Sequence, residues 1–216
     1  MKAKNFWILF SLFIVPLLFY IFLLTGTNNF AKLPVLTEKV GDIKNFIADD
    51  ESALSLDGKI TILCFLGSDL ESSKTNALNL NEKIYKHFHK FTDFQVIAVS
   101  PIGNEVAAEK LKEKIAFVTD MSKWKFVFNT PEQIETLFAS LKTTYSLNQN
   151  SYSEYAFIID KEMHLRGRTD DEDVANGILY GYSAETVSPI HNKMVDDVKV
   201  LVAEYRLALK KYNREI

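Results

Sequence analysis

Cysteine is nearly absent from this sequence: Cys64 is the single one among 216 residues. One cysteine cannot form an intrachain disulfide, and it leaves no Cys-x-x-Cys pair to shuttle electrons or to bind zinc. Cys64 lies inside the apolar run ITILCFL, where burial would raise the pKa of its thiol and hide it from reagents. We therefore expect Cys64 to behave as a small hydrophobic residue, and we expect no thiol redox chemistry.

An excess of basic charge is also lacking, because 25 Lys and Arg residues face 28 Asp and Glu residues, for a net charge of -3. A nucleic-acid partner would have to bind without the counterion release that usually dominates such binding, so we expect no nucleic-acid ligand. Hydrophobic residues make up 47% of the chain and charged residues 25%. This balance is typical of a globular protein, and the length fits one domain of ordinary size.

A long uncharged run lies near the N-terminus, from Asn5 to Thr25. Its length matches the ~20 apolar residues that a helix needs to cross a bilayer, whereas a cleavable signal peptide has a shorter run of ~7–15 residues and a small-residue cleavage site. Lys2 and Lys4 precede the run, and the positive-inside rule keeps such a flank in the cytoplasm. The sequence therefore predicts a single-pass protein of the bacterial inner membrane with a periplasmic C-terminal domain. Its predicted parts are a cytoplasmic stub and transmembrane anchor helix at 1–27, a linker at 28–52 and the domain at 53–216.

The rest of the chain alternates buried-strand patterns, which are continuous apolar runs, with amphipathic helical patterns. Thr130 and Pro131, followed by Gln133, provide the N-cap signature of a helix. The order is a βαβ unit, a helix, a β-hairpin and a terminal helix, which outlines an α/β domain of thioredoxin-like type. The active site of that fold usually lies where the first buried strand ends, which is the loop Ser68–Ser73 here. Strands are predicted at 58–67, 94–99, 124–128, 155–160 and 164–168, and helices at 73–89, 106–115, 131–141 and 188–212.

Several short stretches together resemble the Sco/SenC family, and their order and spacing carry the resemblance over nearly the whole chain. Members of this family are membrane-anchored proteins with a thioredoxin-like fold that deliver copper to cytochrome c oxidase or reduce its copper site. The resemblance therefore implies a Sco-type domain behind the transmembrane helix, and a role in oxidase assembly. The matching stretches are Lys32-Leu33-Pro34-Val35, Gly58-Lys59, Val99-Ser100-Pro101, Trp124, Ile159-Asp160-Lys161 and Leu165-Arg166-Gly167.

The loop that defines the family is altered in this chain. The family's Cys-Pro-x-x-Cys-Pro motif aligns with Ser68–Ser73, so Ser68 and Ser72 stand where the two cysteines would be. The family's histidine aligns near Tyr152, and its aspartate before the proline of the second strand is Ser100 here. Copper(I) prefers sulfur ligands, and a serine hydroxyl supplies neither that softness nor a redox couple. The resemblance thus implies a degenerate member without catalytic residues, metal or cofactor.

Other residues suggest metal sites more weakly. Met163 and His164 could contribute to a non-standard copper site, although a histidine in a turn usually faces solvent. His87 and His89 are two apart on a predicted helix and would point in divergent directions. His191, at the start of the last helix, is expected to face solvent.

The acidic run Asp170–Asp173 lacks the alternating oxygen ligands and the glycine of a calcium loop. We expect Thr169 to cap a short helix whose first turn holds these acidic residues. The following segment, Val174–Val187, is rich in Gly, Tyr and Ala. It is either an insertion that contacts a partner or an ordinary packed loop.

The sequence leaves two functions open and nearly excludes a third. The main expectation is a membrane-anchored, non-enzymatic Sco-like protein that serves as accessory or assembly partner of a respiratory or other envelope complex. The alternative is a copper-handling chaperone that uses a Met/His site with Met163 and His164. A thioredoxin-type oxidoreductase or peroxidase would need nucleophilic and resolving thiols, and the site loop has neither.

Overall fold

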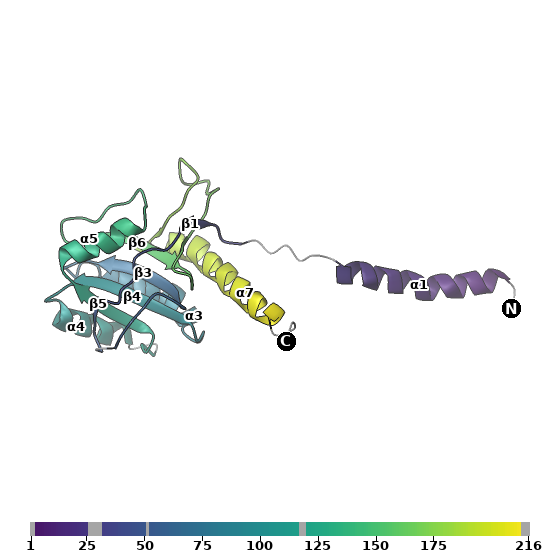
Figure 1. The fold of residues 1–216 in the computed structure, drawn as a ribbon, viewed down its shortest axis with the longest axis horizontal. Coiled ribbons are helices and arrows are strands. Elements are labelled where there is room, and N and C mark those ends of the chain that lie inside the picture. Colours follow the sequence, from purple (N-terminus) through teal and green to yellow (C-terminus); the bar gives the residue numbers. More distant parts are fainter. Residues whose placement is uncertain (1–2, 26–31, 51, 117–119, 213–216) are drawn as a thin grey trace. The chain divides into compact units, whose positions relative to one another are not determined.

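The computed structural model describes residues 3–25, 32–50, 52–116 and 120–212, which belong to two compact units. The unit Met1–Ala31 contains helix α1 (Ala3–Thr25), and the unit Lys32–Ile216 contains a mixed sheet with helices packed on it (Figure 1). Within the part of the chain that the structure describes, no helix has both the length and the apolar character needed to cross a membrane. The predicted transmembrane span is therefore not confirmed.

The sheet places the ends of four strands at one edge. Strands β3, β4 and β5 run parallel, and β6 runs antiparallel beside β3, so that Leu66 at the end of β3 pairs with Tyr152 at the start of β6. Because β3 and β4 are buried along their whole length, they read as continuous apolar runs. The strand order is β1-β7-β6-β3-β4-β5-β2, with β8 paired to β6. The described strands are β1 (Val35–Thr37), β2 (Ile47–Ala48), β3 (Ile60–Leu66), β4 (Phe94–Pro101), β5 (Trp124–Asn129), β6 (Tyr152–Ile159), β7 (Leu165–Arg166) and β8 (Tyr182–Ser183).

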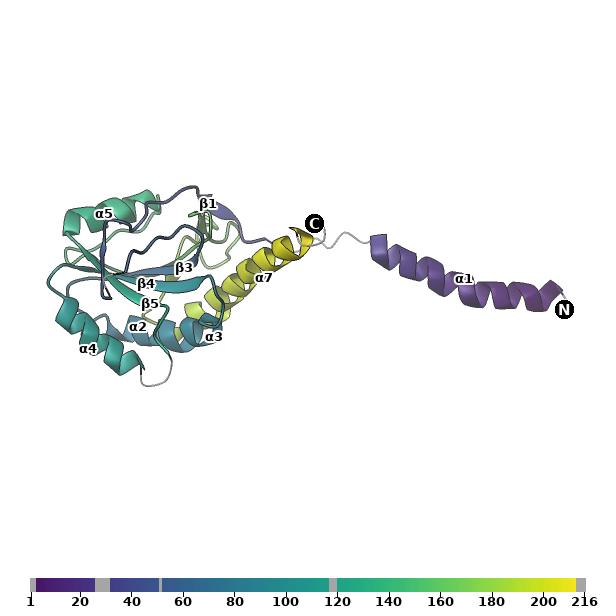
Figure 2. The same ribbon diagram turned by 60° about the horizontal axis from the view of Figure 1, so that its bottom comes forward.

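Helices cover both faces of this sheet, and Figure 2 shows α5 on one side with α2, α3 and α4 on the other. Side chains alternate along β3, so that Ile62 and Cys64 join the core beneath α2, α4 and α7, whereas Leu63 and Phe65 join the core beneath α5. Two separate hydrophobic cores result. The helical segments are α2 (Lys74–Leu80), continued by the π-helical turn η1 (Asn81–Tyr85) and α3 (Lys86–Phe88), then α4 (Glu105–Ala116), α5 (Pro131–Ser140), and α6 (Val187–Pro189) continued by the π-helical turn η2 (Ile190–Met194) and α7 (Val195–Tyr212). The predicted strands and helices of the domain are confirmed, with ends shifted by at most about three residues.

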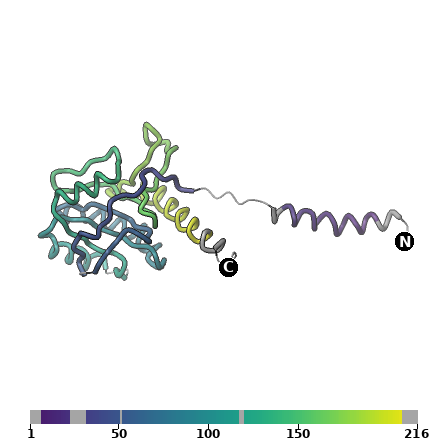
Figure 3. Tube along the Cα trace, in the orientation of Figure 1, coloured from purple at the N-terminus to yellow at the C-terminus, as the bar shows by residue number. Residues whose placement is uncertain are grey.

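Most of the predicted linker belongs to the domain, so that boundary is wrong. Residues 32–50 run across the domain surface (Figure 3), where β1 pairs with β7 and β2 pairs with β5. Between these strands, Val40 and Ile43 are fully buried in the core beneath α5. These strands are too short to show a repeating apolar pattern, so the sequence alone predicts a linker for this segment.

The predicted helix at Asp170–Asp173 is also wrong, because these residues form turns. Asp171 turns inward, and its two carboxylate oxygens accept hydrogen bonds from Lys193 Nζ at 2.6 and 2.7 Å. Its side chain is 1% exposed. A partner 22 residues away along the chain thus overrides the local preference for a capped helix.

The predicted N-cap of α5 is confirmed, and it gives a first test of the fold. Thr130 Oγ1 accepts a hydrogen bond from the backbone N–H of Gln133 at 3.4 Å, with Pro131 in the first turn. Thr130→Ala should lower the free energy of unfolding by about 1 kcal/mol, measured by urea denaturation. Thr136→Ala on the exposed face of the same helix is the matched control, and it should be neutral or slightly stabilising. An equal loss in both variants would contradict the capping role.

Candidate functional site

The loop that follows β3 lies at the sheet edge where β4 ends and β6 begins. Gly67 has a φ of +71°, and a Cβ atom there would lie 2.7 Å from the Asn150 carbonyl oxygen and from Tyr152 Cβ. Only glycine permits this turn. The backbone N–H of Ser68 donates to the Asn150 carbonyl at 2.9 Å, and Ser100 Oγ donates to the Gly67 carbonyl at 2.8 Å. The start of the loop is therefore fixed to both neighbouring strands, and Ser100 has a structural role.

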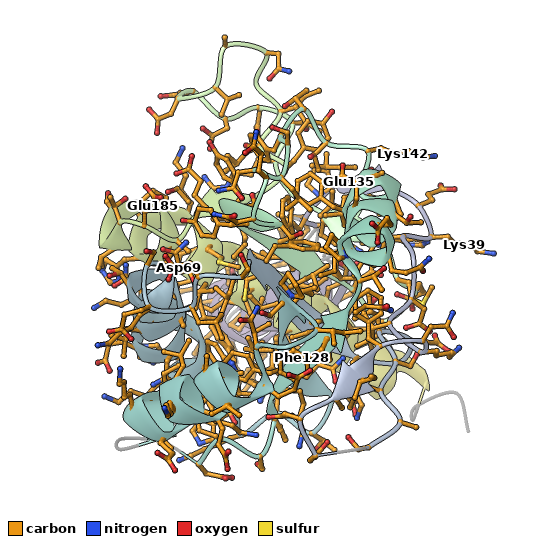
Figure 4. The ribbon with its side chains drawn as sticks, turned by 90° about the vertical axis from the view of Figure 1, so that its left-hand side faces the viewer. Lys39, Asp69, Phe128, Glu135, Lys142 and Glu185 are labelled. Carbon is orange, nitrogen blue, oxygen red and sulfur yellow. The ribbon has the colours of Figure 1, made fainter. Side chains whose placement is uncertain are left out.

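Two of the three positions that match the lost family site share one pocket. Ser72 and Tyr152 both line a pocket of about 240 Å³, while Ser68 is exposed at the start of the loop. Figure 4 looks at this end of the domain, with Asp69 and Glu185 labelled near each other at the left. The described lining contains oxygen and amide groups but no sulfur and no imidazole, which suits copper(I) poorly. The lining residues are Leu66, Asp69, Ser72, Ser73, Asn148, Asn150, Tyr152 and Glu185.

The Ser72 hydroxyl is engaged with a carboxylate rather than activated as a nucleophile. Ser72 Oγ donates to Asp69 Oδ2 at 2.7 Å, and the Ser72 backbone N–H donates to Asp69 Oδ1 at 3.2 Å. The side-chain hydrogen bond from Ser72, followed by its backbone hydrogen bond, lowers the pKa of Asp69. A carboxylate with a lowered pKa is a poor general base near neutral pH. The pair therefore stabilises the loop without providing an acid–base couple.

Tyr152 bridges two elements that are far apart in the sequence. Its Oη accepts a hydrogen bond from Asn76 Nδ2 on α2 at 3.0 Å and donates one to Glu185 Oε1 at 2.9 Å. Burial raises the pKa of Tyr152 to about 12, and the hydrogen bond to Glu185 acts in the same direction. The phenol is therefore neutral at physiological pH, and it joins α2 to the segment before α6.

Asn76 and Glu185 are site residues that sequence reasoning missed. They lie 76 and 33 residues from Tyr152 along the chain. Asn79, one turn beyond Asn76, adds a further tie by donating from Nδ2 to the Ala184 carbonyl at 2.9 Å. An exposed glutamate and a helical asparagine carry no local pattern, so only the folded arrangement reveals them.

The lone thiol lies outside this pocket, as predicted. Cys64 is 2% exposed on β3, and its Sγ lies 3.6 Å from the Ile97 carbonyl oxygen. Burial raises the pKa of the Cys64 thiol to about 12. A thiol in this state is neither a nucleophile nor a metal ligand near neutral pH.

The structure does not bring Met163 and His164 to the pocket. Both lie in the turn after β6, and the length of that strand, at about 3.3 Å per residue, puts them roughly 23 Å from Tyr152. Met163 packs against the core beneath α5, and His164 Nδ1 lies 3.5 Å from Asp160 Oδ2. Within the described ranges, no group of three or more His, Cys, Asp or Glu side chains is placed to hold a metal ion.

The other histidines are also dispersed. His87 and His191 are exposed, as the sequence predicts, and His89 is partly buried, with Nδ1 lying 3.1 Å from the Tyr85 carbonyl oxygen. His87 and His89 lie two residues apart at the end of α3, and His191 lies on another segment. Among the described residues, none of them belongs to a group of three or more side chains that could hold a metal ion.

Removal of the Tyr152 hydroxyl tests its bridging role. Tyr152→Phe should lower the free energy of unfolding by about 1–3 kcal/mol, because the buried amide of Asn76 loses its acceptor. Tyr180→Phe is the matched control: its ring is also partly buried, no hydrogen bond of its hydroxyl is found among the described residues, and the change should stay within about 0.5 kcal/mol. Thermal and urea denaturation measure both. Equal effects would show that the Tyr152 hydroxyl does not carry this bridge.

Comparison with known proteins identifies solved structures that share the fold of this domain. No family model matches the sequence, and no curated protein matches it. Among solved structures, the chain is similar to BsSco, a member of the Sco family of cytochrome c oxidase assembly proteins, with a TM-score of 0.56 and 13% identity over 79% of this chain and 98% of that one. A SCO1/SenC family lipoprotein from Bacillus anthracis gives a TM-score of 0.54 and 14% identity, over 82% and 99% of the two chains.

A proposed protein disulfide isomerase from Bacteroides thetaiotaomicron is also similar, with a TM-score of 0.52 and 13% identity over 79% of this chain and 94% of that one. Identities this low show a shared fold and leave activity open. The compact unit Lys32–Ile216 therefore has the thioredoxin-like fold of the Sco/SenC proteins, as the sequence resemblance predicts.

Proposed function

We propose that this chain is a non-catalytic Sco-like protein, held at a membrane by its N-terminal segment, that acts by contact with a protein partner during assembly of a respiratory or other envelope complex. The observation that carries the proposal is the pair of hydroxyls at Ser68 and Ser72 on a loop fixed at the end of β3. The loop keeps its place in the fold, yet it holds no thiolate. Cys64, four residues before the loop, has a buried thiol with a raised pKa.

The fold supports a respiratory setting. Two of the similar structures are Sco proteins, and one of them is described as a cytochrome c oxidase assembly protein. A chain that keeps this fold without the sulfur ligands of the Cys-x-x-x-Cys loop lacks the groups that bind copper or exchange electrons. Contact with a partner is therefore the activity that remains open to it.

The N-terminal segment supports membrane attachment. The run Asn5–Thr25 has no charge, and the described side chains of α1 are mostly apolar and largely exposed, among them Trp7, Phe13 and Phe22. Lys2 and Lys4 orient such a segment with its N-terminus in the cytoplasm. The single pass through the inner membrane and the periplasmic placement of the domain stay predictions.

Copper handling through Met163 and His164 is the alternative, and it has less support. The two residues lie at the far end of β6 from the pocket, and His164 faces the buried carboxylate of Asp160. His164→Ala tests this alternative directly, because unchanged copper affinity would remove it.

Cross-linking in native membranes tests the proposal as a whole. The full-length chain, with an affinity tag at its C-terminus, is cross-linked in its own membranes, purified, and assayed for both protein partners and copper in the same sample. We expect subunits or assembly factors of an envelope complex to co-purify, and copper to be far below stoichiometric. Stoichiometric copper without any partner would contradict the proposal.

A further inference from the structure

A second pocket, separate from the loop after β3, is formed by the segment that follows the acidic run. It has a volume of about 290 Å³ and lies between this segment, Tyr145 and the start of the last helix. Figure 1 shows the segment as the light green loop at the top of the domain. The lining residues are Tyr145, Tyr155, Asp173, Val174, Leu179, Gly181, Tyr182, Ser183, Ser188, Pro189, Asn192 and Lys193.

The walls of this tyrosine pocket are largely aromatic and apolar. The rings of Tyr145 and Tyr155 stack with centroids 3.8 Å apart and planes 3° apart. Gly181 brings the backbone close to the sheet, because a Cβ atom there would lie 2.8 Å from Phe157 Cε1. Flat aromatic walls favour another planar apolar group, which gains ring contacts beyond its buried area.

Partly buried ion pairs and a tyrosine hydrogen bond hold the pocket in shape. Tyr182 Oη donates to Asp197 Oδ2 at 2.5 Å, and Arg168 Nε donates to the same oxygen at 2.7 Å. Lys193 Nζ binds both oxygens of the buried Asp171 carboxylate. The segment is thus fixed on the last helix, and a preformed pocket loses little entropy when it binds a ligand.

Charge decides which ligands the pocket accepts. Lys193, the cation of the lining, is neutralised by Asp171 and also by Asp173 at 2.7 Å. The Asp173 side chain is 80% exposed at the mouth. Asp170 and Glu172 are exposed nearby, and neither forms an ion pair within the part of the chain that the structure describes. With no free cation, the pocket disfavours phosphates and carboxylates, and its acidic mouth favours a basic ligand.

The volume of the tyrosine pocket further limits which ligands can fit. About 290 Å³ lies at the lower end of small-molecule pockets, which span roughly 300–1,000 Å³. It accepts one large side chain and excludes a nucleotide or a haem. Single aromatic side chains that fill well-packed pockets are frequent anchors at protein interfaces.

We propose that the tyrosine pocket binds one aromatic side chain, flanked by Lys or Arg, in an extended segment of a partner protein. This inference rests on the proposed function only in taking the ligand to be a protein. The aromatic ring lies against Tyr145 and Tyr155, and the flanking cation contacts Asp173 at the mouth.

Peptide binding to the full-length chain in detergent tests the pocket. The probe is a fluorescein-labelled Lys-Phe-Lys tripeptide amide, followed by fluorescence anisotropy and compared with Lys-Ala-Lys and Glu-Phe-Glu amides. We expect each comparison peptide to bind at least about tenfold more weakly, since the first lacks the ring and the second has the wrong charge. Equal binding of Lys-Ala-Lys would overturn the proposal by showing that charge alone attracts the probe.

Two variants, with one control, test whether the peptide binds in the tyrosine pocket. Ser188→Trp fills the pocket from an exposed lining position and should weaken Lys-Phe-Lys binding by about tenfold or more, whereas Thr186→Trp, exposed outside the lining, should not. Asp173→Lys reverses the charge of an exposed side chain and leaves Lys193 paired with Asp171. It therefore keeps the test valid if the tryptophan disturbs folding, and it should also weaken binding. Unchanged affinity in Asp173→Lys, or in a folded Ser188→Trp, would overturn the pocket assignment. Stoichiometric copper without a partner in the membrane-purified sample would contradict the proposed function, but it would not affect the peptide-binding result. The two proposals can therefore fail independently of each other.

Discussion

The triple variant Ser68→Cys/Ser72→Cys/Tyr152→His is expected to bind a stoichiometric Cu(I) ion where the unchanged chain binds none. The loop start is already fixed by Gly67 and by the Ser68–Asn150 hydrogen bond. Ser72 and Tyr152 already line one pocket. A thiolate at position 72 and an imidazole at position 152 would lie in this pocket, and a second thiolate at position 68 would lie at the start of the same loop; together they would supply the soft ligands that copper(I) prefers. The gain in copper affinity should come from the three new side chains alone, because the substitutions are not expected to change the backbone that carries them.

Competition with a coloured Cu(I) chelator measures this gain. The control carries the same two added thiols elsewhere, as Ser52→Cys/Ser122→Cys, both at exposed positions. The triple variant should withdraw copper from the chelator and the control should not. Because Tyr152→His also removes the acceptor of the Asn76 amide, circular dichroism must confirm that the triple variant is folded. A folded triple variant without copper affinity would show that the loop does not occupy the Sco-type position.

Arg166→Leu is expected to give the largest loss of stability. The Arg166 guanidinium is 7% exposed and binds the fully buried Asp160 at 2.8 Å and Glu204 on α7 at 2.7 Å. Its Nε also donates to the Leu33 carbonyl at 2.8 Å. One side chain thus ties the start of the domain and its last helix to the hairpin. Without it, the buried Asp160 carboxylate loses its guanidinium partner and keeps only two backbone N–H donors and the nearby His164 imidazole. Removing one partner of a buried ion pair costs about 3–5 kcal/mol.

The matched control for this loss is Arg206→Leu on α7. Arg206 is exposed, with its guanidinium 4.4 Å from the centre of the Phe91 ring, and such a contact is worth about 0.5–1 kcal/mol. Differential scanning calorimetry should show Tm lowered by roughly 6–20 °C in Arg166→Leu, at the shift per kcal/mol expected for a domain of this size, and by far less in Arg206→Leu. Similar shifts in the two variants would mean that the buried ion pairs do not carry the stability assigned to them.

Local sequence patterns predict the centre of this fold well. The run from Ile60 to Leu66 is apolar on both faces of β3, and that pattern has few interpretations other than a buried strand. The Thr130-Pro131 signature defines the start of α5 to the residue. In both cases the deciding interactions lie within a few residues of one another, so the sequence alone contains the information.

Long-range contacts account for what the sequence does not predict. Asp171 forms a turn rather than a helix because Lys193 binds its carboxylate. The edge strands β1 and β2 exist because β7 and β5 offer them backbone partners. At the site, Ser68 and Ser72 could be found by alignment with the family loop, whereas the partners of Tyr152 come from elements distant in the sequence. The helical or strand periodicity of hydrophobic residues does not indicate which distant residues will be in contact.

A Cu(I) titration of the purified full-length chain against the same coloured chelator tests the central claim most directly. The claim is that hydroxyls at positions 68 and 72, and a buried thiol at position 64, leave the loop after β3 without a soft ligand for copper(I). The chelator complex should keep its full absorbance as protein is added. Withdrawal of one equivalent of copper by the unchanged chain would contradict the account.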